Sequence, residues 1–238
     1  MNHVAKIPLL IVTFTLVALF WCKLLPFVSA QSLTSSNVTI DPTEDVPVEI
    51  SDIRVVTMPY PHLEYKVSNV SQERLVALEI TWHFVFPNGK TTVSGTRLDY
   101  LFDDSMRLSG GASERITTTQ LPMLNTRDDP SRMSVTGATG KVTFAEFSNN
   151  NRLGSNREGV LPWLAGERNS RMDEYRNLSK LLRLGGEAAL HQVLTDEKSA
   201  LSEQGSGVRR ELGQLEVNKG MAVVTDTLNK RVAIRIPE

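Results

Sequence analysis

The side chains that could perform chemistry in this chain are mainly carboxylates. Catalytic groups need only meet in space, so a site can be built from residues that are far apart in the sequence. Two carboxylates that face each other in a cleft could hydrolyse a substrate by general acid–base catalysis. The candidates for such a site are Asp99, Asp103, Asp104 and Glu146. If all of them lie on separate exposed turns, a module without catalytic activity is favoured.

No other residue type forms a recognised catalytic or metal-binding motif. No serine occurs in Gly-x-Ser-x-Gly, and the Gly-Ser-Gly segment at 205–207, which only resembles it, is predicted to be a flexible break. His62, His83 and His191 lack metal-ligand spacing, and we interpret them as solvated or hydrogen-bonded structural residues. The sequence therefore assigns no catalytic residue, no metal ligand and no cofactor, and the residues that bind a partner are unknown.

Two acidic pairs are candidates for calcium binding, because calcium prefers several oxygen ligands. Neither pair has the alternating Asp/Asn spacing of a calcium loop. We interpret both as turn residues, whose side chains bond the local backbone. The pairs are Asp103-Asp104 and Asp128-Asp129, to which Asp41, Glu44 and Asp45 could add further oxygens.

The first 30 residues have the pattern of a secretory signal peptide. They contain no acidic residue, and an apolar stretch runs from Ile7 to Cys22. The small residues Val28 and Ala30 precede a possible cleavage point before Gln31. We expect the mature protein to be periplasmic or extracellular. The alternative is a membrane anchor through residues 7–27, because an uncleaved apolar segment of ~20 residues spans a bilayer.

The charge and cysteine counts restrict the class of protein. The chain has 26 Lys and Arg against 27 Asp and Glu, so it carries no basic excess for nucleic acid. Cleavage after Ala30 removes Lys6, Lys23 and the single cysteine, Cys22. The mature chain is then mildly acidic and free of disulfides and thiol chemistry, and its hydrophobic core must hold it together.

The strongest signal of secondary structure is a hairpin between Leu75 and Leu98. Every second residue from Val76 to Phe86 is large and apolar, so these side chains line one face of a strand. Asn88-Gly89 tolerates the positive φ angles of a tight turn, and Lys90–Leu98 is the expected returning strand. With shorter alternating segments at 50–56, 63–67, 114–119, 133–135 and 141–147, the pattern predicts an antiparallel β-sandwich over 46–156. An extended linker or disordered lead-in is expected at 31–45.

The segment 46–156 resembles the Ig-like or fibronectin-III-like sandwich domains that are common in exported bacterial proteins. The resemblance rests on the strand Leu63–Val67, the strand that bears Trp82, the Asn88-Gly89 turn, and the late strand Lys141–Phe147 with its polar turn. The cysteine pair of antibody-type domains is absent, so only the architecture is implied. Such domains serve adhesion, ligand binding and spacing, so the resemblance implies no particular activity.

After Gly159 the apolar residues recur every three or four positions, which is the spacing of a helix. Residues 157–238 are therefore expected to form a helical region. A first helix is predicted around Tyr175 and Leu178, with a break at Gly185-Gly186. A second is predicted from Ala189 to Leu201, and a third over 208–217. The β-branched residues between 223 and 236 predict a terminal strand or hairpin as an alternative ending.

A short apolar cluster, Leu161–Leu164, is expected to lie in a connector before the helices. It contains Trp163, and aromatic residues of this type are enriched at binding hot spots. We interpret the cluster instead as a staple that holds the helices on the sandwich, because an isolated apolar cluster between two folded parts usually buries itself.

The sequence predicts an α+β protein, in which an antiparallel Ig-like β-sandwich is followed by a helical C-terminal region. The favoured function is a non-enzymatic binding or structural module at the cell envelope or outside the cell, with a protein or an envelope polymer as partner and no nucleic acid. The alternatives are an exported hydrolase that uses the carboxylates above, and a membrane-anchored module. Homo-oligomers could form through two leucine stripes, Leu178/Leu182 and Leu190/Leu194/Leu201.

Overall fold

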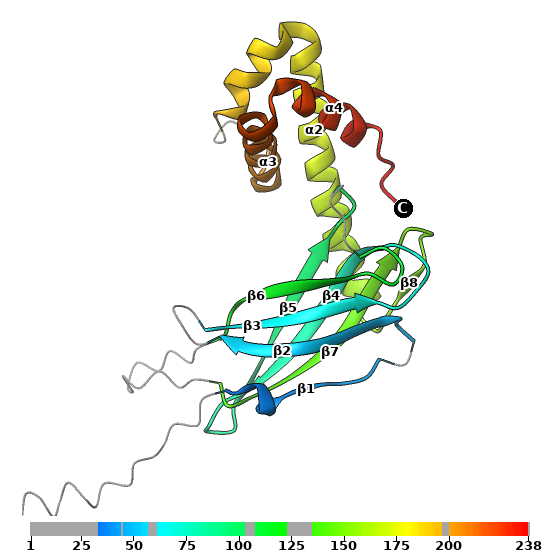
Figure 1. Ribbon diagram of the computed structural model, residues 1–238, viewed down its shortest axis with the longest axis vertical. Helices are drawn as coiled ribbons and strands as arrows, with labels where there is room; N and C mark the ends of the chain where they lie inside the picture. Colours follow the sequence, from blue (N-terminus) through cyan, green and yellow to red (C-terminus); the bar gives the residue numbers. More distant parts are fainter. Residues whose placement is uncertain are drawn as a thin grey trace, which may run out of the picture.

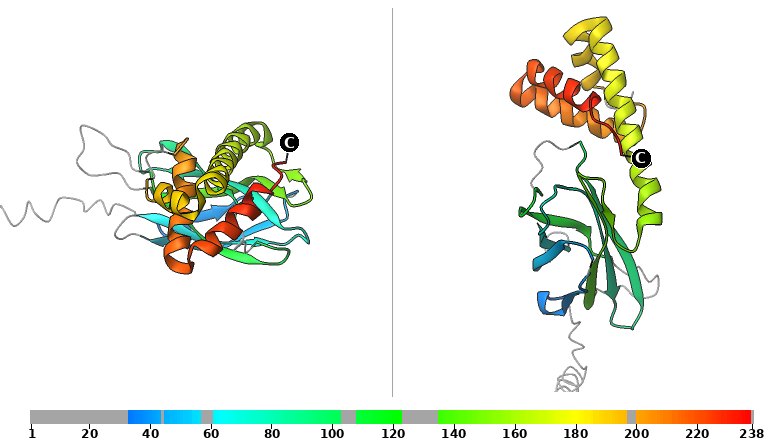
Figure 2. Two further views of the ribbon diagram at one scale, coloured as in Figure 1. Left: turned by 90° about the horizontal axis from the view of Figure 1, so that it is seen from above. Right: turned by 90° about the vertical axis from the view of Figure 1, so that its right-hand side faces the viewer.

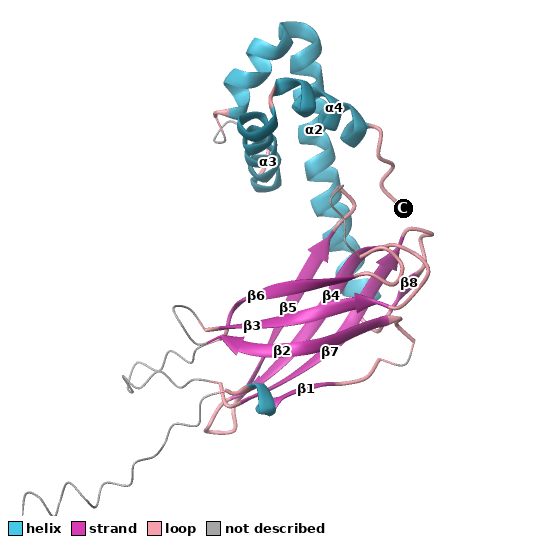
Figure 3. Cartoon of the chain, in the orientation of Figure 1, coloured by secondary structure: helices cyan, strands magenta, loops and turns pink. Residues whose placement is uncertain are grey.

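The computed structural model describes residues 33–43, 45–56, 61–102, 108–122, 135–196 and 200–237, and the predicted signal peptide at 1–30 lies outside them. Two β-sheets form one end of the molecule and a helical head forms the other (Figure 1; coloured by element type in Figure 3). The chain therefore has an α+β fold. Its elements are η1 (Ser35–Asn37), β1 (Val38–Ile40), β2 (Val48–Val56), β3 (His62–Asn69), β4 (Leu75–Val85), β5 (Thr91–Asp99), β6 (Ser113–Gln120), β7 (Gly137–Phe147), β8 (Arg152–Leu153), α2 (Arg157–Leu194), α3 (Glu203–Lys219) and α4 (Met221–Val232).

The described strands form two sheets. The larger has the order β1-β7-β4-β5, with β8 also paired to β7, and the smaller has the order β2-β3-β6. β1 runs parallel to β7, with Val38 opposite Ala138, so the prediction of purely antiparallel pairing is wrong. This strand lies in the segment expected to be a linker, and it forms because Val38 and Ile40 pack against the core.

The predicted hairpin is confirmed as β4 and β5, which pair from Ala77 opposite Asp99 to Val85 opposite Thr91. The apolar face of β4 points into a core between the two sheets, where the rings of Trp82 and Tyr65 lie 5.3 Å apart. On β7, a Cβ at Gly140 would lie 2.5 Å from the Trp82 ring, so only glycine fits there. The predicted strands at 50–56, 63–67, 114–119 and 141–147 form as β2, β3, β6 and β7, whereas most of 133–135 lies outside the described residues.

The helical head has its own core, which the predicted leucine stripes help to build. Gly186 (φ 71°, ψ −169°) interrupts α2, as predicted, and the chain turns there toward α3. Figure 2 shows α3 and α4 projecting from one side of α2. The buried core residues are Phe102, Met172, Tyr175, Leu178, Leu190, Leu194, Val208, Leu212, Val224 and Leu228.

Four features of this region differ from the predictions. Segment 161–164 belongs to α2 and not to a connector, and the helix predicted to reach Leu201 ends at Leu194. The Gly-Ser-Gly segment at 205–207 lies inside α3, whose first turn is capped by the Ser202 side chain. Residues 221–232, in the region where a terminal strand or hairpin was the alternative, form helix α4, whereas 233–237 is neither helix nor strand. Burial of Val224 against the head outweighs the strand preference of valine. In the described part of the chain, no helix is long and apolar enough to cross a membrane.

Candidate functional site

Two of the carboxylates proposed for catalysis meet under the base of α2. Strand alternation explains how they come together: Ala77 on β4 lies opposite Asp99 on β5 and opposite Glu146 on β7. The two carboxylates therefore stand at the same level of the larger sheet, on the face away from the other sheet. The other two candidates, Asp103 and Asp104, lie outside the described residues.

The guanidinium group of Arg168 on α2 occupies the space between these carboxylates. Arg168 Nη2 lies 2.9 Å from Asp99 Oδ1 and 2.5 Å from Glu146 Oε2, and Arg168 Nε donates to Asp99 Oδ2 at 3.1 Å. Arg152 Nε donates to the second Glu146 oxygen at 2.8 Å. The exposed fractions of the Arg168, Asp99 and Glu146 side chains are 2%, 8% and 0%. A clamp of this kind joins elements, because both carboxylates are paired with the same guanidinium group.

The balance of burial and charge at Arg168 keeps the guanidinium protonated. Burial would lower the pKa of Arg168, but hydrogen bonds from its guanidinium to Asp99 and Glu146, together with their negative charges, raise that pKa above its ordinary value. The guanidinium group of Arg168 therefore stays charged in the folded protein.

A third buried carboxylate, Glu79, lies next to this clamp on β4, opposite Arg97 on β5. It accepts hydrogen bonds from Arg97 Nε (2.8 Å), Thr143 Oγ1 (2.7 Å) and Asn156 Nδ2 (2.7 Å). Burial would raise the pKa of Glu79, but these hydrogen bonds and the charge of Arg97 lower it below 4.5. Asn156 immediately precedes α2, so the Glu79 network also connects the sheet to the helical head.

The apolar cluster at 161–164 supplies the hydrophobic part of the same contact. Val160 and Leu164 are buried against Ala77 and Phe144 of the sheet, and Trp163 packs beside them. The Arg97 guanidinium lies 5.3 Å from the centre of the Trp163 ring, a favourable cation–π distance. The interpretation of the cluster as a staple is therefore confirmed.

Glu79 and Arg168, the two most connected residues of this contact, were not among the residues predicted from the sequence. Glu79 lies on the polar face of β4, and alternation alone does not reveal that a helix covers that face. Arg168 is one of many charged residues on α2. Its partner Asp99 lies 69 residues earlier in the chain, on β5, and its other partner, Glu146, lies on β7. The sequence signal for this contact was strand alternation, which places Ala77, Glu79, Asp99 and Glu146 on the face of the larger sheet that points away from the other sheet.

The histidines are separated from this contact and from one another. His62 Nε2 lies 3.6 Å from Glu64 Oε1, His191 Nδ1 lies 2.6 Å from Glu216 Oε1, and His83 is exposed on β4. Among the residues that the structure describes, no group of three or more His, Cys, Asp and Glu side chains could hold a metal ion. Of the calcium candidates, only Asp41 and Asp45 are described.

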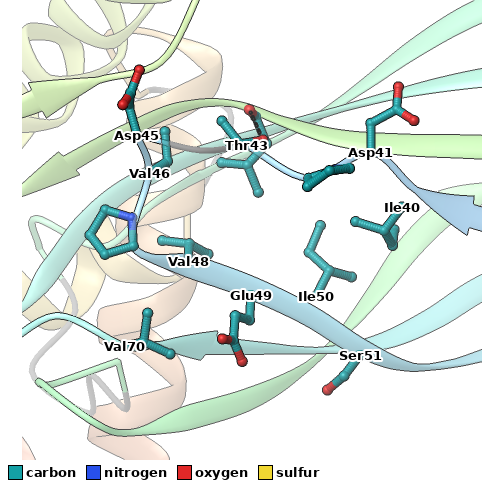
Figure 4. A pocket seen from close by; sticks show the side chains of 13 residues that line it. Ile40, Asp41, Thr43, Asp45, Val46, Val48, Glu49, Ile50, Ser51 and Val70 are labelled. Carbon is teal, nitrogen blue, oxygen red and sulfur yellow. Dashed lines mark hydrogen bonds between the residues drawn. The ribbon is translucent and has the colours of Figure 1, made fainter.

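Asp41 and Asp45 border a groove between the edge strands β1 and β2 (Figure 4). Its volume is about 570 Å³. Figure 4 shows Val48 and Ile50 directed into the hollow, whereas the carboxylates of Asp41 and Asp45 point away from it. The groove could accept an apolar group between Val48 and Ile50, and the carboxylates of Asp41, Asp45 and Glu49 also belong to its lining.

Comparisons with known proteins give no family for this chain. No family model and no curated protein matches it. One similar solved structure is a hypothetical protein from Peptoclostridium difficile 630, which is 11% identical and has a TM-score of 0.29. The match covers 50% of this chain and 92% of that one.

Proposed function

We propose that this protein is an exported, non-enzymatic binding or structural module, in which an Ig-like β-sandwich holds a helical head in a fixed orientation. The observation that carries the proposal is the position of Arg168 between Asp99 and Glu146. Two of the four carboxylates considered for hydrolysis, Asp99 and Glu146, serve as the anchoring points of the head. Their burial and pairing remove the free, water-accessible carboxylate that general acid–base catalysis requires.

The strand order supports the Ig-like part of the proposal. In the nomenclature of Ig domains, the smaller sheet β2-β3-β6 would correspond to strands A, B and E. In the larger sheet, β4, β5, β7 and β8 would then correspond to strands C, C′, F and G, and β1 would be an additional strand. Trp82 then lies on strand C, buried in the core, which is where Ig domains carry their buried tryptophan. The absence of cysteine from this core agrees with a sandwich held by packing alone.

The joint between the sheet and α2 supports a module of fixed shape. Three kinds of contact cooperate there: the Arg168 clamp, the Glu79 network and the Trp163 staple. Paired buried charges require defined geometry, because a displaced Arg168 guanidinium would leave Asp99 buried without this counter-charge and Glu146 with Arg152 alone. A partner would therefore meet the sandwich and the head as one preformed surface.

The absence of catalysis can be tested with the full chain and with Asp99→Asn. We expect neither protein to hydrolyse model esters, phosphates or glycosides, and Asp173→Asn on the exposed surface of α2 is the matched control. Turnover by the wild type that disappears in Asp99→Asn but persists in Asp173→Asn would overturn the proposal.

Export is proposed from the N-terminal sequence. Expression of the full chain in an exporting host, followed by N-terminal sequencing of the exported protein, tests it. We expect Gln31 as the first residue. An exported protein that begins at Met1 and stays in the membrane would instead establish the anchored form through residues 7–27.

A further inference from the structure

A second cavity lies between the end of β5 and the helical head, and all three helices contribute to it. Its volume is about 800 Å³. One wall consists of Leu98, Asp99, Tyr100 and Phe102, and the other contains residues of α2, α3 and α4. Pockets for small molecules typically measure ~300–1,000 Å³ and occur preferentially between two structural units, and this cavity meets both conditions.

The cavity lining carries more positive than negative charge. Arg171, Lys219 and Arg231 contribute three cations, and the carboxylates in the lining are those of Asp99 and Glu211. Asp99 is already held by Arg168 through both of its oxygens. Glu211 Oε2 pairs with Arg171 Nη2 at 3.4 Å and Glu211 Oε1 pairs with Arg231 Nη2 at 3.9 Å, so two guanidinium groups share one partly exposed carboxylate. The cavity therefore has an excess of positive charge.

The position of the guanidinium groups suits the recognition of an anion. Arg231 is only 4% exposed, so its charge acts where solvent screens it weakly. Guanidinium groups present several N–H donors in a planar fork, which matches the oxygens of a carboxylate or a phosphate. Gln214 and Asn218 on α3 add amide donors to the same lining.

The remaining lining is apolar. The Arg171 guanidinium lies 5.0 Å from the centre of the Phe102 ring, which keeps this cation beside an apolar surface. Leu215 on α3 and Val223 on α4 also line the cavity, and Val223 is 37% exposed. A ligand that satisfied both parts of the cavity would have an anionic head and an apolar body.

We propose that this cavity binds a small organic anion, in which a carboxylate or phosphate head lies beside Arg171 and Lys219 and an apolar body lies against Leu215 and Val223. This inference rests on the proposed function, because it names the ligand class of the binding module. A ligand in this position contacts both the sandwich and the head, so it braces the two parts against each other.

Isothermal titration of the full chain tests the proposal with octanoate, octyl phosphate, inorganic phosphate and octyltrimethylammonium. We expect octanoate or octyl phosphate to bind more tightly than inorganic phosphate, and the cationic probe not to bind. Which of the two anionic probes binds more tightly identifies the head group. Arg171→Gln should weaken binding by about tenfold or more, because it removes a charge-assisted hydrogen bond.

The controls separate the site from general electrostatic attraction. Lys90→Gln, in the turn between β4 and β5, should leave the affinity unchanged, whereas Lys219→Gln should lower it and serves as the second variant if Arg171→Gln fails to fold. Failure of both anionic probes to bind, or equal binding by wild type, Arg171→Gln and Lys219→Gln, would overturn the site and leave the proposed function intact. Release of inorganic phosphate from octyl phosphate would overturn the non-enzymatic function and leave the site intact.

Discussion

Arg168 on α2 holds Asp99 at the end of β5 through both carboxylate oxygens, with Nη2 at 2.9 Å from Oδ1 and Nε at 3.1 Å from Oδ2. The same guanidinium reaches Glu146 on β7. One side chain of the helical head therefore connects two strands of the larger sheet. Since all three groups are buried, the connection depends on complete pairing.

We expect Arg168→Met to destabilise the protein by about 3–5 kcal/mol, because it leaves two carboxylates buried without their shared counter-charge. Urea denaturation followed by circular dichroism measures the loss. Arg176→Met is the matched control on the same helix: its partner Asp173 and Arg176 itself are both more than half exposed, so the expected change is about 0–1 kcal/mol. Equal losses for the two variants would show that the clamp does not anchor the head.

We expect Glu79 to make the free energy of unfolding depend on pH in the acidic range. The pKa of Glu79 is below 4.5 in the folded state, so the unfolded chain takes up this proton more readily. The stabilisation is present above about pH 4.5 and is lost as the pH falls through the folded-state pKa. The free energy of unfolding of wild type should therefore exceed that of Glu79→Gln at pH 7, and the difference should shrink between pH 5 and pH 3.

The control for this titration is Glu49→Gln, which changes an exposed carboxylate on β2. Its difference from wild type should be small at every pH. A constant difference between wild type and Glu79→Gln across the whole range would mean that hydrogen bonding alone, and not the charge of Glu79, stabilises the joint.

Two glycines should respond to alanine with opposite signs. Gly140→Ala brings a Cβ to 2.5 Å from the Trp82 ring, and overpacking of this kind costs about 1–3 kcal/mol. Gly166→Ala on α2 places its Cβ in open space, and we expect a gain of about 0.5–1 kcal/mol from helix propensity. Thermal and urea unfolding of both variants check the signs. Stabilisation by Gly140→Ala would contradict the close approach of β7 to Trp82.

We expect Trp163→Ala to destabilise the protein by about 2 kcal/mol, because Trp163 contributes apolar packing and a cation–π contact to the joint. Limited proteolysis should then cut between the sandwich and α2 faster than in wild type. Leu184→Ala is the control, since Leu184 is 77% exposed on the same helix. If Trp163→Ala were as stable as Leu184→Ala, the staple would not hold the head.

Elements with a local cause could be predicted from the residues alone. Alternation from Val76 to Phe86 and the turn at Asn88-Gly89 defined the hairpin, because side chains on a strand change face at every residue. The stripe through Tyr175 and Leu178 likewise defined a helical face, and Gly186 marked its interruption.

Tertiary structure decided everything that depends on distant partners. β1 joins β7 across about 100 residues, and nothing in the sequence 38–40 specifies that neighbour. Residues 223–224 favour a strand locally, but burial of Val224 against the head makes them helical. The role of Asp99 and Glu146 was decided in the same way, because their types allow catalysis or pairing. Only the arrival of Arg168 on a helix packed over the sheet turned them into an ion-pair clamp.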